Sequence, residues 1–132
     1  MSRSDNHAYR AAKVYEVEHQ LKDEGYYVFR RTSPHGLFHV LGLKDGKLTM
    51  IQVERLHKFN ENAFNNSMIK VVEFAQEQNY PEGTSIELWI WINHRGWMKY
   101  KLRNDGQFLL YEDFGWNHFR SKDQIKEFYR NV

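Results

Sequence analysis

Two stripes of apolar residues at helical spacing, separated by strand-sized segments, restrict the folds open to this chain more than any other feature. In residues 10–24, Ala11, Val14, Val17 and Leu21 recur every three or four positions, and Gly25 follows as a C-terminal stop. The second stripe, over residues 61–79, consists of Phe64, Met68, Val71, Val72 and Ala75. The sequence therefore predicts two amphipathic helices that each cover one face of a sheet.

Strand signals occupy the remaining segments. "YYVFR" is aromatic and β-rich, "TSPHG" is a turn, and "LFHVLGL" and "KLTMIQVER" flank an Asp45-Gly46 hairpin turn. After the second stripe, "SIELWIWIN" and "GWMKYKLR" are joined by "HRG", and "QFLLYED" follows an Asp105-Gly106 turn. These segments predict three strands before the second helix and two or three after it.

The order of these elements defines the expected fold class. The chain is expected to form a helix, three strands, a second helix and two or more further strands. This order predicts one α/β domain over residues 1–132, with a mixed central sheet of about five strands flanked by helices. Regular strand-helix alternation and a glycine-rich phosphate loop are both missing, which excludes a doubly wound nucleotide-binding fold.

Near the end of the sequence, Ser121 and Gln124 resemble a capping box before a helical stripe of Ile125, Phe128 and Tyr129.

Composition removes several function classes. The chain contains no cysteine, which excludes disulfides, thiolate zinc sites and cysteine nucleophiles. Its longest apolar runs are strand-sized and "MSRSDNHAYR" is polar, so we expect neither a membrane span nor a signal peptide, and a cytoplasmic location. The formal charge is only +2, but basic residues cluster locally, as in Arg30-Arg31 and Lys99, Lys101 and Arg103. Such clusters indicate either phosphate contacts or a solvated surface.

Residues 10–102 resemble a known family of nucleases. Seven segments follow one another at the family's spacing. They are a helix ending in "LKDEGYYVFR", the turn "SPHG", the strand "FHVLGL", a glycine hairpin, "LTMIQVE", a helix ending in "VVEFAQE" and "LWIWINHRGWMKY". In these motifs the chain resembles the archaeal-type Holliday junction resolvases, of the PD-(D/E)xK nuclease superfamily. The resemblance implies a restriction-endonuclease-like fold, with residues 103–132 as a C-terminal extension.

The resemblance also places the family's catalytic residues on this sequence. In that family an acid on each of two strands holds Mg²⁺, a lysine two residues after the second acid assists, and a glutamate on the first helix completes the site. Here the two strand acids correspond to His39 and Gln52, the lysine to Glu54 and the helix glutamate to Val14. Because Mg²⁺ prefers several anionic oxygens, we expect a degenerate site, no bound cofactor and no Mg²⁺-dependent cleavage.

An alternative site remains open, because Glu18 lies one helical turn from Val14 on the same face. In this interpretation an altered nuclease would hold Mg²⁺ or Mn²⁺ with Glu18, His39, Gln52 and Glu54. The other interpretation is that these polar side chains only form hydrogen bonds with one another.

Arg30 corresponds to the family's arginine after the first strand, which implies a contact with junction phosphates. Other side chains around the turn and the second hairpin strand would extend this surface, or would simply be solvated. The complete set of expected DNA contacts is Arg10, Lys13, Arg30, Arg31, Ser33, His35, Arg55, His57 and Lys58.

Two tryptophans predict a second apolar face on the sheet. Trp89 and Trp91 alternate with Ile90 and Ile92 along one strand. If the isoleucines lie on one face of the sheet, the tryptophans therefore lie on the other face. Either a second subunit, a helix of the same chain or, less simply, stacked bases would cover them. We expect a homodimer formed through the second helix and the later strands, because Phe64, Phe74, Trp89 and Trp91 supply more apolar surface than one small sheet needs.

Three functions follow from these expectations. The first is binding of branched, four-way junction DNA by a homodimeric pseudo-nuclease in DNA recombination. The second is an active metal-dependent, structure-specific endonuclease with a variant site. The third is a protein-interaction module on a nuclease fold, with a partner protein or an active paralogue as its ligand.

Overall fold

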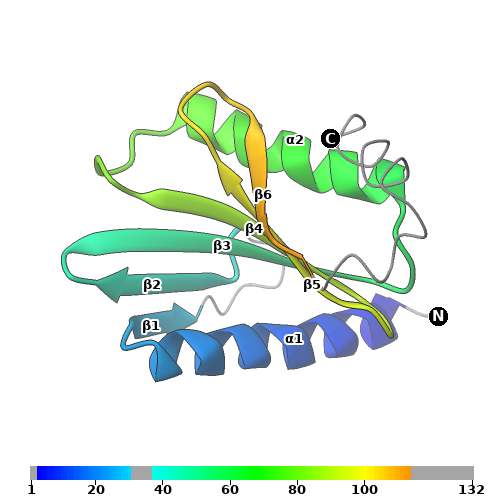
Figure 1. Cartoon of the computed structure of the whole chain (residues 1–132). Helices are drawn as coiled ribbons and strands as arrows, with labels where there is room; N and C mark the ends of the chain where they lie inside the picture. The colour runs from blue at the N-terminus through cyan, green and yellow to red at the C-terminus, as the bar shows by residue number, and fades with distance from the viewer. Residues whose placement is uncertain (1–2, 31–36, 114–132) are drawn as a thin grey trace.

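A six-stranded mixed sheet lies between two helices in the computed structural model, which describes residues 3–30 and 37–113 (Figure 1). The elements are α1 (Arg3–Asp23), β1 (Tyr27–Arg30), β2 (Val40–Lys44), β3 (Lys47–Leu56), α2 (Glu61–Glu77), β4 (Ser85–Ile92), β5 (Gly96–Leu102) and β6 (Phe108–Glu112). The predicted α/β class is confirmed. The sheet has six strands where about five were expected, because the segment after the Asp105-Gly106 turn pairs with β5 as β6.

The strands follow one another across the sheet in chain order, β1-β2-β3-β4-β5-β6. All neighbours are antiparallel except β3 and β4, which are parallel and are joined through α2. A parallel pair needs a crossover connection, and α2 supplies it. No described helix has the length and apolar character needed to cross a bilayer.

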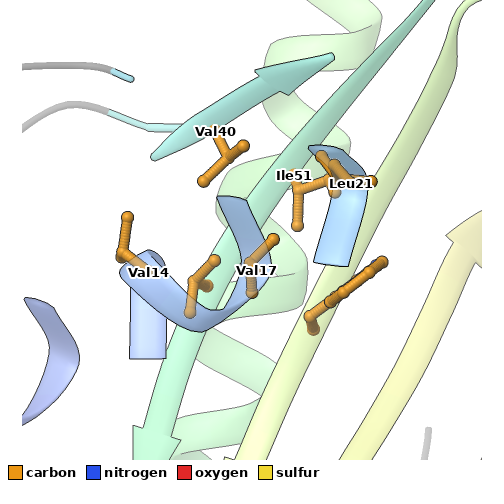
Figure 2. Close-up of a cluster of buried hydrophobic side chains, with 7 residues drawn as sticks. Val14, Val17, Leu21, Val40 and Ile51 are labelled. Carbon is orange, nitrogen blue, oxygen red and sulfur yellow. The ribbon is translucent and has the colours of Figure 1, made fainter. Parts of the chain in front are cut away.

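The helix α1 covers the β1-β2-β3 side of one face. Val14, Val17 and Leu21 of α1 pack against Val40 and Ile51 of the sheet (Figure 2). The helix ends at Asp23, and the following Gly25 has a φ of 92°. The Gly25 N–H donates to the Lys22 carbonyl, and the Tyr26 N–H donates to the Leu21 carbonyl. This is a Schellman C-cap, the ending that the stop glycine predicts.

The other face is covered by α2. Phe64 packs against Leu88, Ile90 and Tyr100, and Val71 packs nearer the other end of the helix with Ile86 and Phe38. The N-cap of α2 is Asn60, whose side chain accepts a hydrogen bond from the Ala63 N–H at 3.0 Å.

The tryptophan face is covered by the chain itself. Trp89 is only 3% exposed and belongs to the α1 cluster, and the Lys13 ammonium of α1 lies 3.4 Å from the centroid of the Trp91 ring. Phe64 is 1% exposed under α2, and Phe74 is partly buried against Phe38. These aromatic side chains therefore do not require a second subunit, and a helix of the same chain covers the tryptophan face, the alternative that the sequence left open.

Candidate functional site

The hydrogen-bond ladder between β2 and β3 ends next to His39 and Gln52, the positions to which the family resemblance assigns the strand acids. Val40 and Ile51 form the terminal Cα pair, and the preceding Phe38 has a φ of 64°, which turns the chain out of extended geometry. The Phe38 N–H donates to Gln52 Oε1 at 2.7 Å, and the Val53 N–H donates to His39 Nδ1 at 3.1 Å. Two buried backbone donors thus bind side chains in place of a partner strand.

This arrangement determines what the two side chains can do. His39 Nδ1 accepts the Val53 N–H, and Arg10 Nη1 lies 3.4 Å from the other ring nitrogen, Nε2. The Gln52 amide donates through Nε2 to Glu54 Oε1 at 2.8 Å. His39 and Gln52 therefore support the backbone and orient Glu54.

The four positions of the family's catalytic set do not meet on one face. Ile51 and Val53 point toward α1, so the alternating Gln52 and Glu54 point toward α2. Val14 lies in the α1 cluster on the opposite face, as Figure 2 shows, and is 5% exposed. Gln52 and Glu54 do share a face, as their spacing predicts, but the helix position is separated from them by the sheet.

The alternative metal-binding set is not assembled either. Glu18 Oε1 lies 3.0 Å from Arg30 Nε, and their orientation makes this an ionic contact without a hydrogen bond. In the part of the chain that the structure describes, no three histidine, aspartate or glutamate side chains come close enough to hold a metal ion. His39 and Glu54 are instead engaged as described above.

The register of the sheet brings many basic residues to one end of the molecule. Arg30, the last residue of β1, pairs with Val40 and through it is level with Ile51 in the middle of β3, so Arg30 lies away from the end of β3. Leu56 pairs with Ile92 and Ile92 with Gly96, so the end of β3 and the β4–β5 turn lie together at one end of the sheet. We call this the basic end. Its members among the described residues are Arg10, Arg55, His57, Lys58, His94 and Arg95.

The individual side chains at this end differ in exposure. His57 and Lys58 are exposed. Arg30, which lies outside the basic end, has a side chain that is 47% exposed despite its contact with Glu18. Arg55 is half-buried and its Nε donates to Asn93 Oδ1 at 2.9 Å.

Lys13 is a correction to the expected DNA contacts. Its side chain is 10% exposed, its ammonium pairs with Glu16 at 2.9 Å, and the same ammonium lies over the Trp91 ring. An ammonium held by these two groups serves the helix packing, so Lys13 does not belong to the phosphate-contact set. Arg31, Ser33 and His35 lie outside the described residues, as do Ser121 and Gln124.

Sequence reasoning missed His94 and Arg95. We interpreted "HRG" only as a turn, although its position between two antiparallel strands places it at the same end as the residues after β3. Both side chains are exposed.

Sequence reasoning also missed a polar cluster at the other end of the sheet. The buried Glu87 carboxylate accepts hydrogen bonds from Ser85 Oγ at 2.8 Å, from Trp89 Nε1 at 2.9 Å and from the Tyr111 hydroxyl. Burial and the adjacent Glu87 charge raise the pKa of Tyr111 above its usual range. Glu87, Trp89 and Tyr111 border a hollow of about 490 Å³. Because the Glu87 oxygens already have three donors, the network serves to attach β6 to the sheet.

A scan against protein-family models and a search of curated proteins find no match to this chain. The resemblance to the archaeal-type resolvases therefore rests on its sequence motifs.

Proposed function

We propose that this chain binds branched DNA through the basic end, on a restriction-endonuclease-like fold, without Mg²⁺-dependent cleavage. The observation that carries the proposal is the gathering of basic side chains from α1, the end of β3 and the β4–β5 turn at one end of the sheet. Phosphate contacts from such a surface bind DNA without reading its sequence, and their arrangement selects its shape. The order from α1 to β4, with a parallel β3-β4 pair, supports the proposed fold.

The chemistry of the degenerate positions supports binding over cleavage. Mg²⁺ requires several oxygen ligands, usually including carboxylates, and Val14, His39 and Gln52 provide none of the expected carboxylates. His39 and Gln52 are moreover engaged with the backbone donors of Val53 and Phe38. DNA would therefore be held next to a surface that lacks the means to activate water with Mg²⁺.

The experiment that tests this function measures affinity for a labelled four-way junction and for a linear duplex of the same sequences over a range of salt. We expect tighter binding to the junction and a steep loss of affinity with salt. Lys58→Ala should reduce the slope of log affinity against log salt by about one. Lys47→Ala is the matched control, because Lys47 is equally a surface lysine but starts β3 at the opposite end.

The same assay separates the competing functions. Binding that is undetectable for both DNAs at low salt would remove the DNA-binding proposal and favour the protein-interaction module. Cleavage in parallel reactions with Mg²⁺ or Mn²⁺, abolished by Glu54→Ala, would establish the altered endonuclease instead. Arg30→Ala is a poorer test, because it leaves the buried Glu18 carboxylate without its cation.

We further propose that the active form is a homodimer joined through α2, so that two basic ends meet one branched DNA. Ile69 on α2 is 52% exposed, beside the half-buried Met68 and Val72. Together with Phe108 these residues line a hollow of about 200 Å³ between α2 and β6. An apolar surface of this kind on a helix is typical of a subunit interface.

Light scattering checks the dimer. The unchanged protein should have about twice the mass of one 16.0 kDa chain, and Ile69→Glu should shift it toward the monomer because a carboxylate at an interface loses its hydration. Lys70→Glu, at the neighbouring exposed position on α2, should leave the mass unchanged. A monomer at all concentrations for the unchanged protein would exclude this interface.

A further inference from the structure

The turn between β4 and β5 forms a compact cationic tip. It consists of Asn93, His94 and Arg95, followed by Gly96, and the Arg95 N–H closes it by donating to the Ile92 carbonyl at 2.9 Å. His94 has a φ of 64° and Gly96 a φ of 135°, the reversals that a short hairpin turn requires. Both His94 and Arg95 are exposed, so the tip presents their side chains outward.

The tip is attached to the end of β3 by two hydrogen bonds. The Asn93 N–H donates to the Leu56 carbonyl at 2.9 Å, and Arg55 Nε donates to Asn93 Oδ1 at 2.9 Å. The turn therefore keeps a constant position relative to His57 and Lys58, which follow β3. Groups held in place before binding lose less conformational freedom when a ligand arrives.

The base of the hairpin is held by aromatic packing. The Trp91 and Trp97 rings meet edge to face with centroids 5.4 Å apart, and the Lys13 ammonium covers the Trp91 ring. This contact joins the hairpin to α1, just as Asn93 joins it to β3. In Figure 1 the β4–β5 hairpin accordingly reaches the N-terminal part of α1.

The charge of the two adjoining segments has one sign. Residues 91–98, at the tip, contain histidine and arginine but no aspartate or glutamate, and residues 55–60 contain arginine, histidine and lysine and again no acid. A phosphate that approaches the tip therefore meets cations from both segments without an adjacent carboxylate from either.

We infer that the β4–β5 hairpin tip is a preorganised phosphate-binding element of the basic end, with Arg95 as the contacting residue and Asn93 as a positioning residue. The inference rests on the proposed DNA-binding function and identifies the second segment, beside residues 55–58, that holds the DNA backbone. The planar guanidinium of Arg95 can bind two oxygens of one phosphate, a geometry that a lysine does not offer.

The test uses the full chain and a labelled four-way junction, with binding followed over a salt series. Arg95→Ala should lower affinity roughly tenfold at low salt, the loss typical of one charge-assisted contact, and should reduce the salt slope by about one. Arg103→Ala is the control, because Arg103 is an exposed arginine after β5 at the opposite end of the sheet. Its affinity and slope should match those of the unchanged protein.

Asn93→Ala tests the positioning role, because it changes no charge. It should weaken binding through the loss of tip order, while thermal unfolding changes little. If Arg95→Ala binds as tightly as Arg103→Ala, the hairpin inference is wrong while the proposed function stands. If the unchanged protein shows no salt-sensitive binding, both are wrong.

Discussion

Val14→Glu should lower the free energy of unfolding by about 3–5 kcal/mol and should not create a metal ligand. A family comparison alone suggests the opposite, since glutamate is the residue that the nuclease family has at this position. In the structure, however, Val14 is 5% exposed and packs with Val17, Val40 and Ile51. A carboxylate there would lose its hydration among apolar neighbours.

Urea unfolding followed by circular dichroism measures this loss. Ala12→Glu is the matched control, because Ala12 is an exposed residue of the same helix and receives the same added charge. We expect Ala12→Glu to change stability by no more than about 0.5 kcal/mol. A Val14→Glu protein that is as stable as the control and is further stabilised by Mn²⁺ would contradict the assignment of Val14 to the core.

The buried position of Val14 also limits any attempt to restore cleavage by substitution. Converting Val14, His39, Gln52 and Glu54 together to the family's residues would require the helix residue to act from the other side of the sheet. It would also remove the His39 acceptor for the Val53 N–H. We therefore expect loss of stability before any gain of metal binding.

Local patterns predicted most of the fold. The apolar stripe over residues 61–79 corresponds to α2 at Glu61–Glu77, and both Asp-Gly turns connect neighbouring strands. The first helix begins at Arg3, earlier than Arg10, because its opening residues are polar and carry no apolar stripe. The strand expected from Leu37 begins only at Val40, because Phe38 has left-handed backbone geometry that no residue type in this segment signals.

The site was less predictable, because strand spacing tells which residues share a face but not which helix covers that face. Spacing placed Gln52 and Glu54 together, and the structure agrees. The burial of Trp89 by α1 required knowledge of where that helix crosses the sheet. Arg95 joined the basic end only through the register of β3, β4 and β5, which relates residues far apart in the sequence.

The role of Gln52 depends on a contact that no sequence pattern signals. Its Oε1 accepts the hydrogen bond of the Phe38 N–H at 2.7 Å, and both residues are buried. A strand polar residue at this point was open to two interpretations, as a remnant ligand or as a partner for other polar side chains. The observed partner is the backbone, at the place where the β2-β3 ladder ends.

Gln52→Met should therefore destabilise the protein by about 1–3 kcal/mol, because methionine fills a similar volume but leaves the buried Phe38 N–H without its acceptor. Glu54→Ala removes the other partner of Gln52 and should cost less, since Glu54 is partly exposed. Urea unfolding measures both losses, and hydrogen exchange should show faster exchange of the Phe38 amide only in Gln52→Met. Unchanged stability together with unchanged Phe38 protection in Gln52→Met would show that Gln52 is not this structural acceptor, and would reopen its interpretation as a ligand.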